Sequence, residues 1–185
     1  IGITGSNGKT TTVELLNKIF INAGYNSMLG GNVGIPFSIN VLNEIKEESK
    51  KRIHILELSS FQLEQTKNLS LEIGCILNIS EDHLDRYVNY EEYIDAKLKI
   101  INLISSKGHL VYNANDKILK DRLDNSKGIK FSSSDLENAK IDRNRLHLKG
   151  QHNHSNIAAA LAISSKYLIK NNIVFQSIRE FKSLP

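Results

Sequence analysis

A glycine-rich segment near the start of the chain carries residue types that bind phosphate. It reads TGSNGKTT, over residues 4–11, and lies between a short apolar run and a segment with helical spacing. Glycines let backbone amides approach a phosphate chain closely, and the helix N-terminus adds the positive end of its dipole. Lys9 could reach the β- and γ-phosphates, and the Thr10 hydroxyl could ligate Mg²⁺. The residues predicted to bind nucleotide are Gly5, Ser6, Asn7, Gly8, Lys9, Thr10 and Thr11.

The spacing of this loop departs from the strict P-loop. That motif has a glycine five positions before Gly8, where this chain has Ile3. The alternative interpretation is an ordinary glycine-rich turn between a strand and a helix. Because Gly8-Lys9-Thr10 retains the groups that touch phosphate, nucleotide binding is favoured.

A carboxylate follows a second apolar run. Residues 57–64 read ELSSFQLE, and Glu57 stands at the end of an expected strand. α/β proteins place ligand-facing groups at the carboxyl ends of parallel strands, and an acid there could hold the Mg²⁺ of a bound nucleotide. The alternative is an incidental acid near a serine that caps a helix.

A histidine lies among acids at residues 81–87, which read EDHLDRY. His83 and the neighbouring carboxylates could coordinate a second divalent ion, although a single loop histidine is more often solvated. Lys97 follows 14 residues later, on an expected helix that would fold back toward the same edge. The residues alone favour a solvated helix lysine at this position.

Two further segments are polar turns. Asn153 and Asn156 lie one helical turn apart at the start of an Ala-rich helix. Their amides could pair with an adenine edge, or Asn153 or Ser155 could cap the helix. Residues 30–34 read GGNVG after an expected strand and by themselves indicate a tight connection.

The apolar spacing predicts alternating strands and helices. Strands are expected at residues 1–4, 27–29, 53–58, 73–79, 109–112 and 129–132, with a weak edge strand at 144–148. Helices are expected at residues 11–20, 37–45, 90–105, 156–167 and 174–182, and the stretch 116–144 is the most loop-like. This alternation implies right-handed crossovers and an α/β fold, a mostly parallel sheet with helices on both faces.

The composition limits the class of protein. The 185 residues carry a formal net charge of +4, with 24% charged and 40% hydrophobic residues, typical of one globular domain. The mild positive charge suits an anionic ligand but lacks the clustered basic stripe of a nucleic-acid binder. Cys75 is the single cysteine, which excludes an intrachain disulfide and favours a reducing compartment. No apolar run is long enough for a membrane span. We expect a cytoplasmic monomer that binds neither nucleic acid nor membrane.

Taken together, these motifs resemble the central domain of the Mur ligases, the ATP-dependent amide-forming enzymes of peptidoglycan synthesis. The order and spacing of the five motifs carry the resemblance, which covers essentially all 185 residues. ELSSFQLE at 57–64 and DHLDRY at 82–87 are similar to the members that add D-glutamate. The resemblance implies a P-loop-containing Mur ligase central domain over residues 1–185. An N-terminal uridine-nucleotide domain and a C-terminal domain would be absent from the chain.

The resemblance also implies a role for individual positions. Lys9 would contact ATP and stabilise the transferring phosphoryl group, Thr10 and Glu57 would hold one Mg²⁺, and His83 a second. Lys97 matches a lysine that is carbamylated by CO₂, which turns a cation into an anionic metal ligand and replaces the solvated-lysine interpretation. The matches to substrate contacts are Asn32 and Ser59, and the matches to residues near ATP are Asn153 and Asn156.

A two-step reaction follows from the same resemblance. The carboxylate of UDP-N-acetylmuramoyl-L-alanine attacks the γ-phosphate of ATP to give an acyl phosphate and ADP. The D-glutamate amine then attacks the acyl carbon and releases phosphate. The chain alone is not expected to complete this reaction. The alternatives are another Mur-type or folylpolyglutamate-type ligase, a P-loop NTPase motor or switch, and a non-catalytic nucleotide-binding module.

Overall fold

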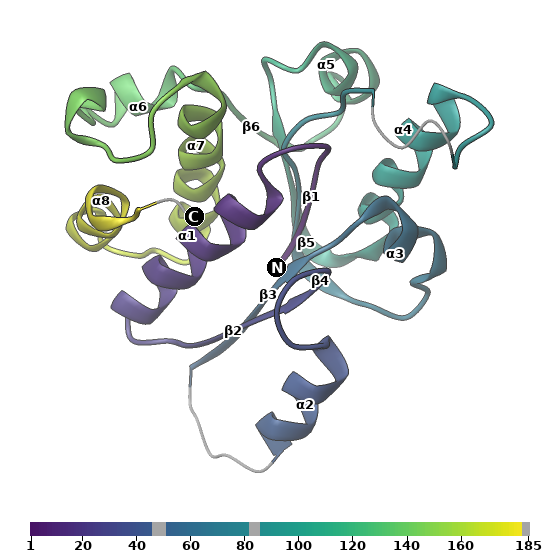
Figure 1. The fold of residues 1–185 in the computed structure, drawn as a ribbon, viewed down its shortest axis with the longest axis horizontal. Coiled ribbons are helices and arrows are strands. Elements are labelled where there is room, and N and C mark those ends of the chain that lie inside the picture. The colour runs from purple at the N-terminus through teal and green to yellow at the C-terminus, as the bar shows by residue number, and fades with distance from the viewer. Residues whose placement is uncertain (46–50, 82–85, 183–185) are drawn as a thin grey trace.

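The computed structural model describes residues 1–45, 51–81 and 86–182. Its centre is a parallel sheet with the strand order β2-β3-β1-β4-β5-β6 (Figure 1). The strands are β1 (Gly2–Thr4), β2 (Asn26–Gly31), β3 (Arg52–Glu57), β4 (Leu71–Ile76), β5 (Ile104–Asn113) and β6 (Ile129–Phe131). The predicted α/β fold with a parallel sheet is confirmed.

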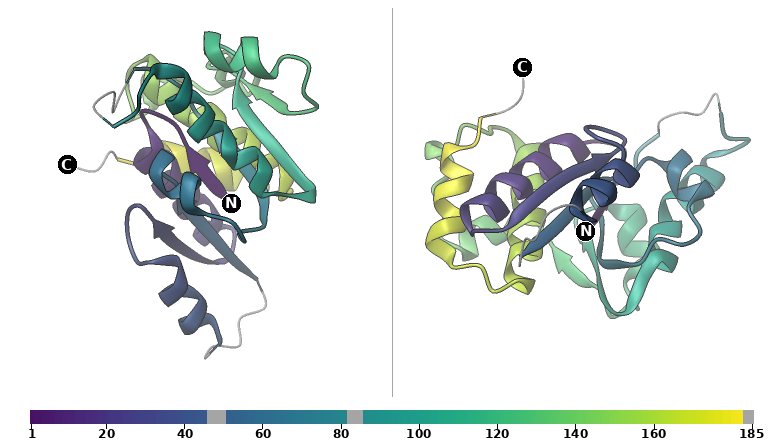
Figure 2. Two further views of the ribbon diagram at one scale, coloured as in Figure 1. Left: turned by 90° about the vertical axis from the view of Figure 1, so that its right-hand side faces the viewer. Right: turned by 90° about the horizontal axis from the view of Figure 1, so that it is seen from below.

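Helices cover both faces of the sheet, as predicted (Figures 1 and 2). One face carries α1 (Lys9–Asn22), α7 (Gln151–Lys166) and α8 (Asn171–Glu180), which contact one another. The other face carries α3 (Ser60–Gln65), α4 (Tyr90–Leu98) and α5 (Lys117–Leu123). The remaining helices are α2 (Phe37–Ile45) beside β2 and α6 (Asp135–Asn138) beside α7. Within the described residues, no helix combines the length and the apolar character needed to cross a membrane.

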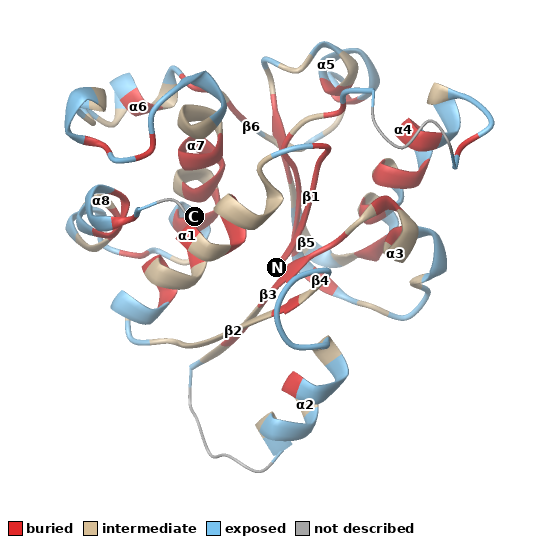
Figure 3. Cartoon of the chain, in the orientation of Figure 1, coloured by how far each residue is buried: buried red, intermediate tan, exposed pale blue. Residues whose placement is uncertain are grey.

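Two hydrophobic cores hold these layers together. The first lies under α1, α7 and α8, and it contains all four apolar residues that the spacing of the first helix points inward (Figure 3). Those residues are Val13, Leu16, Ile19 and Phe20, each at most 3% exposed. The second core lies under α3, α4 and α5 and includes Tyr93 and Tyr112, both fully buried. Burial on both faces explains why the strands read as continuous apolar runs.

Two predicted elements are wrong. The weak strand at 144–148 is absent, and a 3₁₀ turn (Arg143–Arg145) stands there instead. Leu146 and Leu148 are nevertheless buried, so the alternation of apolar and polar residues correctly indicated burial but did not indicate strand pairing. The helix predicted at 90–105 ends at Leu98 and continues as a 3₁₀ helix (Lys99–Leu103). Apolar residues three apart suit a helix with three residues per turn as well as an α-helix.

The strand order places the centre of the sheet at β1. The chain runs from β1 to the strands on one side, β2 and β3, and then crosses to β4 on the other side. At such a reversal of strand order the crossovers separate and leave a crevice at the carboxyl ends of the strands. The glycine-rich segment directly follows β1, so the fold puts it at this crevice.

Candidate functional site

The glycine-rich loop ends at a position that only glycine can occupy. Gly8 has φ of 83° and precedes the first residue of α1. A Cβ at Gly8 would lie 2.3 Å from Oδ1 of Asn156, which belongs to α7. Both the left-handed backbone and the approach of α7 therefore require glycine here. The predicted strand, loop and helix arrangement is confirmed.

Two lysines converge on the loop. Lys9 Nζ donates hydrogen bonds to the carbonyl oxygens of Gly5 at 2.9 Å and Ser6 at 3.0 Å. Lys97 Nζ, from α4, donates to the same Gly5 oxygen at 2.9 Å. The fold thus brings together two cations that are far apart in the sequence, next to a loop of the kind that binds phosphate.

Lys97 is not a solvated helix lysine. Its residue is 2% exposed, and Nζ lies 4.6 Å from the centre of the Tyr93 ring on the preceding turn of α4. The interpretation that the residues alone favoured is therefore wrong. Burying a lysine requires compensating contacts, which here are a carbonyl oxygen and an aromatic face.

Glu57 joins two other predicted residues. Its carboxylate is 2% exposed and accepts a hydrogen bond from Thr10 Oγ1 at 2.8 Å through Oε2. Oε1 accepts a second hydrogen bond from Asn32 Nδ2 at 2.9 Å. The end of β3 therefore links the phosphate loop to the turn that follows β2. This contact could be foreseen only in part, because the sequence did not show that Asn32 and Glu57 meet.

Gly31 allows that contact. It has φ of 99°, and a Cβ there would lie 2.2 Å from the Glu57 carbonyl oxygen. The neighbouring Asn32 amide nitrogen donates to that same oxygen at 2.8 Å. The GGNVG segment is a tight connection, as its composition indicated, and it also presents the Asn32 side chain to Glu57.

Ser59 caps α3. Its side chain accepts a hydrogen bond from the Gln62 backbone nitrogen at 3.3 Å, and its own nitrogen donates to Gln62 Oε1 at 3.0 Å. This reciprocal pair is a capping box, which satisfies two amides at the start of the helix. The cap predicted as the alternative for this segment is present, and it holds Ser59 directly beyond the strand that ends at Glu57.

The paired asparagines lie at the start of α7. The cap position of this helix is Gly150, so the alternative that Asn153 or Ser155 caps it is wrong. Asn156 is 4% exposed beside Gly8, and its Nδ2 lies 3.4 Å from Asn153 Oδ1. A cavity of about 210 Å³ opens between this helix and the loop. Its walls are Asn7, Asn78, Ser80, Asn113, Asn115, Ser133, Gln151, His152 and Ser155.

Sequence reasoning missed the segment that supports the loop. Asn78 follows β4, and its carbonyl oxygen and Oδ1 accept hydrogen bonds from the Ser6 and Asn7 nitrogens at 3.0 and 2.9 Å. Ser6 Oγ in turn donates to the Ser80 carbonyl at 3.0 Å and lies 2.9 Å from the Tyr93 hydroxyl. The polar Asn78 at the end of an apolar strand was the available signal.

The predicted metal ligands fit only in part within the described residues. Glu57 and Thr10 offer a carboxylate and a hydroxyl side by side, the hard oxygen donors that Mg²⁺ prefers. Within the described ranges, the Thr10 hydroxyl and the Asn32 amide that donate to the Glu57 carboxylate are neutral, so its negative charge suits a cation. His83 lies outside the described residues. No group of three His, Cys, Asp or Glu side chains suited to a metal occurs in the part that is described.

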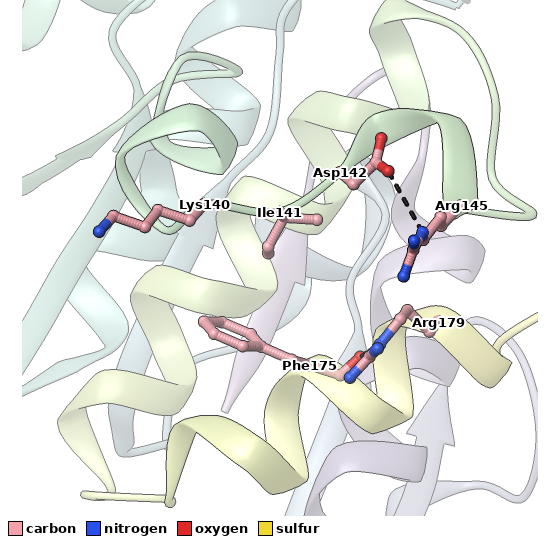
Figure 4. A pocket seen from close by; sticks show the side chains of 6 residues that line it. All are labelled: Lys140, Ile141, Asp142, Arg145, Phe175 and Arg179. Atoms are coloured by element: carbon pink, nitrogen blue, oxygen red, sulfur yellow. Dashed lines mark hydrogen bonds and ion pairs between the residues drawn. The ribbon is translucent and has the colours of Figure 1, made fainter.

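A separate cavity of about 190 Å³ lies beside α8 (Figure 4). It is lined by Lys140, Ile141, Asp142, Arg145, Phe175 and Arg179. Arg145 Nε and the Asp142 carboxylate form an ion pair at 3.4 Å across part of it. None of the predicted residues lines this cavity, so the candidate site is the loop with its neighbours.

Comparison with known proteins identifies a family. Residues 3–164 match the model of the Mur ligase middle domain. The chain is 38% identical over 204 residues to the UDP-N-acetylmuramoylalanine–D-glutamate ligase of Buchnera aphidicola. It is 33% identical over 206 residues to the protein of the same name from Caldicellulosiruptor saccharolyticus. These alignments cover 100% of this chain but 44% and 45% of the relatives. The chain thus spans less than half the length of the curated relatives it matches.

Solved structures share the fold. MurF from Acinetobacter baumannii matches with a TM-score of 0.69 at 18% identity, over 99% of this chain and 46% of that one. A UDP-N-acetylmuramoyl-L-alanyl-D-glutamate–2,6-diaminopimelate ligase matches with a TM-score of 0.70 at 20% identity, over 100% of this chain and 46% of that one. At these identities the likeness is one of fold alone.

Proposed function

The chain belongs to the Mur ligase family as a middle domain, and from that premise we propose that it is the ATP-binding part of a D-glutamate-adding ligase. The full-length enzyme would join D-glutamate to UDP-N-acetylmuramoyl-L-alanine in cytoplasmic peptidoglycan precursor synthesis. The two named relatives above support this choice of amino acid. The uridine-nucleotide domain and the C-terminal domain would make up the rest of the enzyme, which we expect to act as a monomer.

One observation carries the proposal. Lys9, Lys97 and the pair formed by Thr10 and Glu57 converge on a single glycine-rich loop at the carboxyl ends of β1 and β3. A nucleotide-binding turn of no further function would require Lys9 and Thr10. With Mg²⁺ it would also use Glu57, but it would have no need of a buried Lys97.

The residues fit ATP with Mg²⁺. Lys9 would release Gly5 and Ser6 and bind the β- and γ-phosphates, where its charge opposes the charge that builds on the transferring group. Glu57 and Thr10 would hold the ion, which supplies charge neutralisation to the phosphates. Asn153 and Asn156 would face the adenosine part of ATP, beside the polar cavity at the start of α7.

The chemistry that follows is acyl activation. A carboxylate is a poor acyl donor because its leaving group would be oxide, and transfer of the γ-phosphoryl group from ATP supplies phosphate as a good one. Asn32 and Ser59 would orient the substrate carboxylate toward the γ-phosphate, because both lie directly beyond β2 and β3. The D-glutamate amine then attacks the acyl phosphate and phosphate leaves.

Lys97 would act as its carbamate. The ammonium first loses a proton, the neutral amine then adds to CO₂ with formation of a C–N bond, and a second proton leaves, so a cation becomes an anion. Two ammonium groups on one carbonyl oxygen repel each other, and reversing one charge removes that repulsion. The anion would then serve with His83 in holding a second Mg²⁺, as the family resemblance implies.

Two measurements test the proposal. Titration calorimetry of this chain with ATP and Mg²⁺ should show weak binding that Lys9→Ala abolishes, with an unchanged circular dichroism spectrum. Phosphate release by the full-length enzyme should require both the UDP-linked substrate and D-glutamate. L-glutamate and L-lysine should not replace D-glutamate. A rate of ATP hydrolysis that does not depend on the added amino acid would identify an NTPase and contradict the ligase assignment.

A further inference from the structure

The helix α2 leaves three large apolar side chains exposed, although its Phe37 packs against the second core. Asn40 is its one buried residue, at 3% exposed. Ile39, Leu42 and Ile45 are 45%, 58% and 76% exposed. Figure 3 shows α2 as mostly exposed, with a single buried position on the sheet side. A surface helix normally buries its apolar face and exposes its polar one.

This orientation is fixed by a specific contact. Asn40 Nδ2 donates to the Leu29 carbonyl oxygen in β2 at 2.7 Å. Gly30 provides the room, because a Cβ there would lie 2.9 Å from Asn40 Nδ2. Turning the helix to bury its isoleucines would break this hydrogen bond and leave a buried amide without its acceptor. The exposed apolar residues of α2 therefore face outward because the contacts of the helix with β2 hold it in this orientation.

The exposed face continues into the turn before the helix. Val33 and Ile35 are 38% and 48% exposed and follow directly on β2. We call Val33, Ile35, Ile39, Leu42 and Ile45 the apolar stripe. Single exposed apolar residues are ordinary on a protein surface, but a contiguous group marks an interaction site.

The position of the stripe indicates what covers it. A cavity of about 220 Å³ beside α2 is lined by Phe37 and Glu44 from that helix and also by Ile1. In Figure 1 and the left view of Figure 2, α2 projects from the body on the side of β2. Polypeptide that joined the chain at Ile1 would therefore start beside α2, within reach of the stripe.

We propose that the apolar stripe is the docking surface for the domain that precedes residue 1 in the full-length enzyme, and that this domain meets it with an apolar face. The inference rests on the proposed function, because it assumes a full-length enzyme as long as the relatives. Those proteins are more than twice as long as this chain. The stripe begins one residue after Asn32, whose amide contacts Glu57. A domain seated there would hold its bound substrate over the end of β3.

The first test compares hydrogen exchange in this chain and in the full-length enzyme. The amides of α2 should exchange at least tenfold more slowly in the full-length enzyme, because the docked domain excludes water from the stripe. The amides of α8 serve as the internal reference and should not change. Equal exchange of α2 in the two proteins would overturn the proposal, whether or not the enzyme proves to be a ligase.

A second test uses matched substitutions. Leu42→Glu should lower the melting temperature of the full-length enzyme by several degrees and leave this chain unaffected, because Leu42 contacts solvent here. Ile21→Glu is the control, since Ile21 is 53% exposed but lies on α1. Ile45→Glu should repeat the result if Leu42→Glu fails to fold. Equal effects of Leu42→Glu and Ile21→Glu would contradict the docking surface.

A third measurement distinguishes a preceding domain from a second copy of the protein as the partner that covers the apolar stripe. Sedimentation of this chain at increasing concentration should show a weak, Leu42-dependent association at most, and the full-length enzyme should remain monomeric. A full-length dimer that Leu42→Glu converts to monomer would assign the stripe to a second copy and overturn the proposal. If the full-length protein shows slow hydrogen exchange in α2 but has no ligase activity, the result would contradict the proposed function and leave the docking surface supported.

Discussion

Lys9 and Lys97 donate hydrogen bonds to the same oxygen atom, the carbonyl of Gly5, at 2.9 Å each. One lysine belongs to the loop and the other comes from α4, 88 positions later in the printed sequence. Two cations this close repel each other, and two conditions would relieve the repulsion: an anion that binds beside them, or a change of charge on one of them. ATP would satisfy the first condition and carbamylation of Lys97 the second.

Replacement of Lys97 tests the second condition. Lys97→Ala should leave the full-length enzyme nearly inactive, and acetate or formate should restore part of the rate by supplying the missing carboxylate. Lys97→Arg should fail, because it keeps the positive charge. The measurement is the rate of phosphate release with and without the added acid. A Lys97→Ala enzyme that needs no acid would show that the buried lysine has a structural role only.

Glu57 is expected to control the requirement for metal. Glu57→Gln keeps the size of the side chain but replaces one of its two acceptor oxygens with an NH₂ donor and removes the negative charge. The Mg²⁺ concentration that gives half-maximal activity should therefore rise at least tenfold, with a smaller change in the KM for the UDP-linked substrate. His83→Ala should act on the second ion. An unchanged Mg²⁺ titration in both variants would contradict the two-metal proposal.

Two glycines form a matched pair for testing the loop. Gly8 and Gly24 both have φ of 83°, but a Cβ meets Asn156 at Gly8 and nothing within 4 Å at Gly24. Gly24→Ala should cost about 1 kcal/mol of unfolding free energy from backbone strain alone. Gly8→Ala should cost more and should also weaken ATP binding, because the loop or α7 must shift. Denaturant unfolding and calorimetry measure the two quantities. Equal losses in both variants would mean that Asn156 does not restrain the loop.

The single cysteine is expected to be unreactive. Cys75 lies in β4 at 0% exposed, and burial raises the pKa of its thiol far above neutral pH. Only the thiolate reacts with a disulfide reagent, so native protein at pH 8 should show no thiol release until denaturant is added. Because the pKa of the thiol is higher in the folded protein than in the unfolded chain, Cys75 lowers the stability of the fold as the pH rises above the unfolded pKa. Rapid labelling of native protein would contradict the burial of β4.

Stability should accordingly fall at high pH through this residue. The unfolded chain loses the Cys75 proton near its ordinary pKa of about 8.5, while the folded protein retains it. Cys75→Ala should remove this part of the alkaline destabilisation, at the cost of a small core cavity. Denaturant midpoints of the two proteins between pH 7 and about pH 10 would measure the difference.

The sequence by itself determined the elements whose signals are local. The glycine-rich loop, the amphipathic α1 and the apolar strands β3 and β4 follow from neighbouring residues, because backbone conformation and side-chain periodicity act over a few positions. The same locality explains the errors. The alternation at 144–148 correctly indicated burial of Leu146 and Leu148, but strand pairing needs a partner elsewhere in the chain.

Only the tertiary structure decided which of the candidate residues meet. Lys97 reads as an ordinary helix lysine until α4 packs against the sheet and carries it to Gly5. Asn32 reads as part of a turn until β2 pairs with β3 and sets Gly31 opposite Glu57. The outward face of α2 depends on the hydrogen bond from Asn40 to β2 and on the ion pairs of Glu44 with β3. Each contact joins residues from different elements, and its geometry is set by the packing of the sheet, which no local pattern encodes.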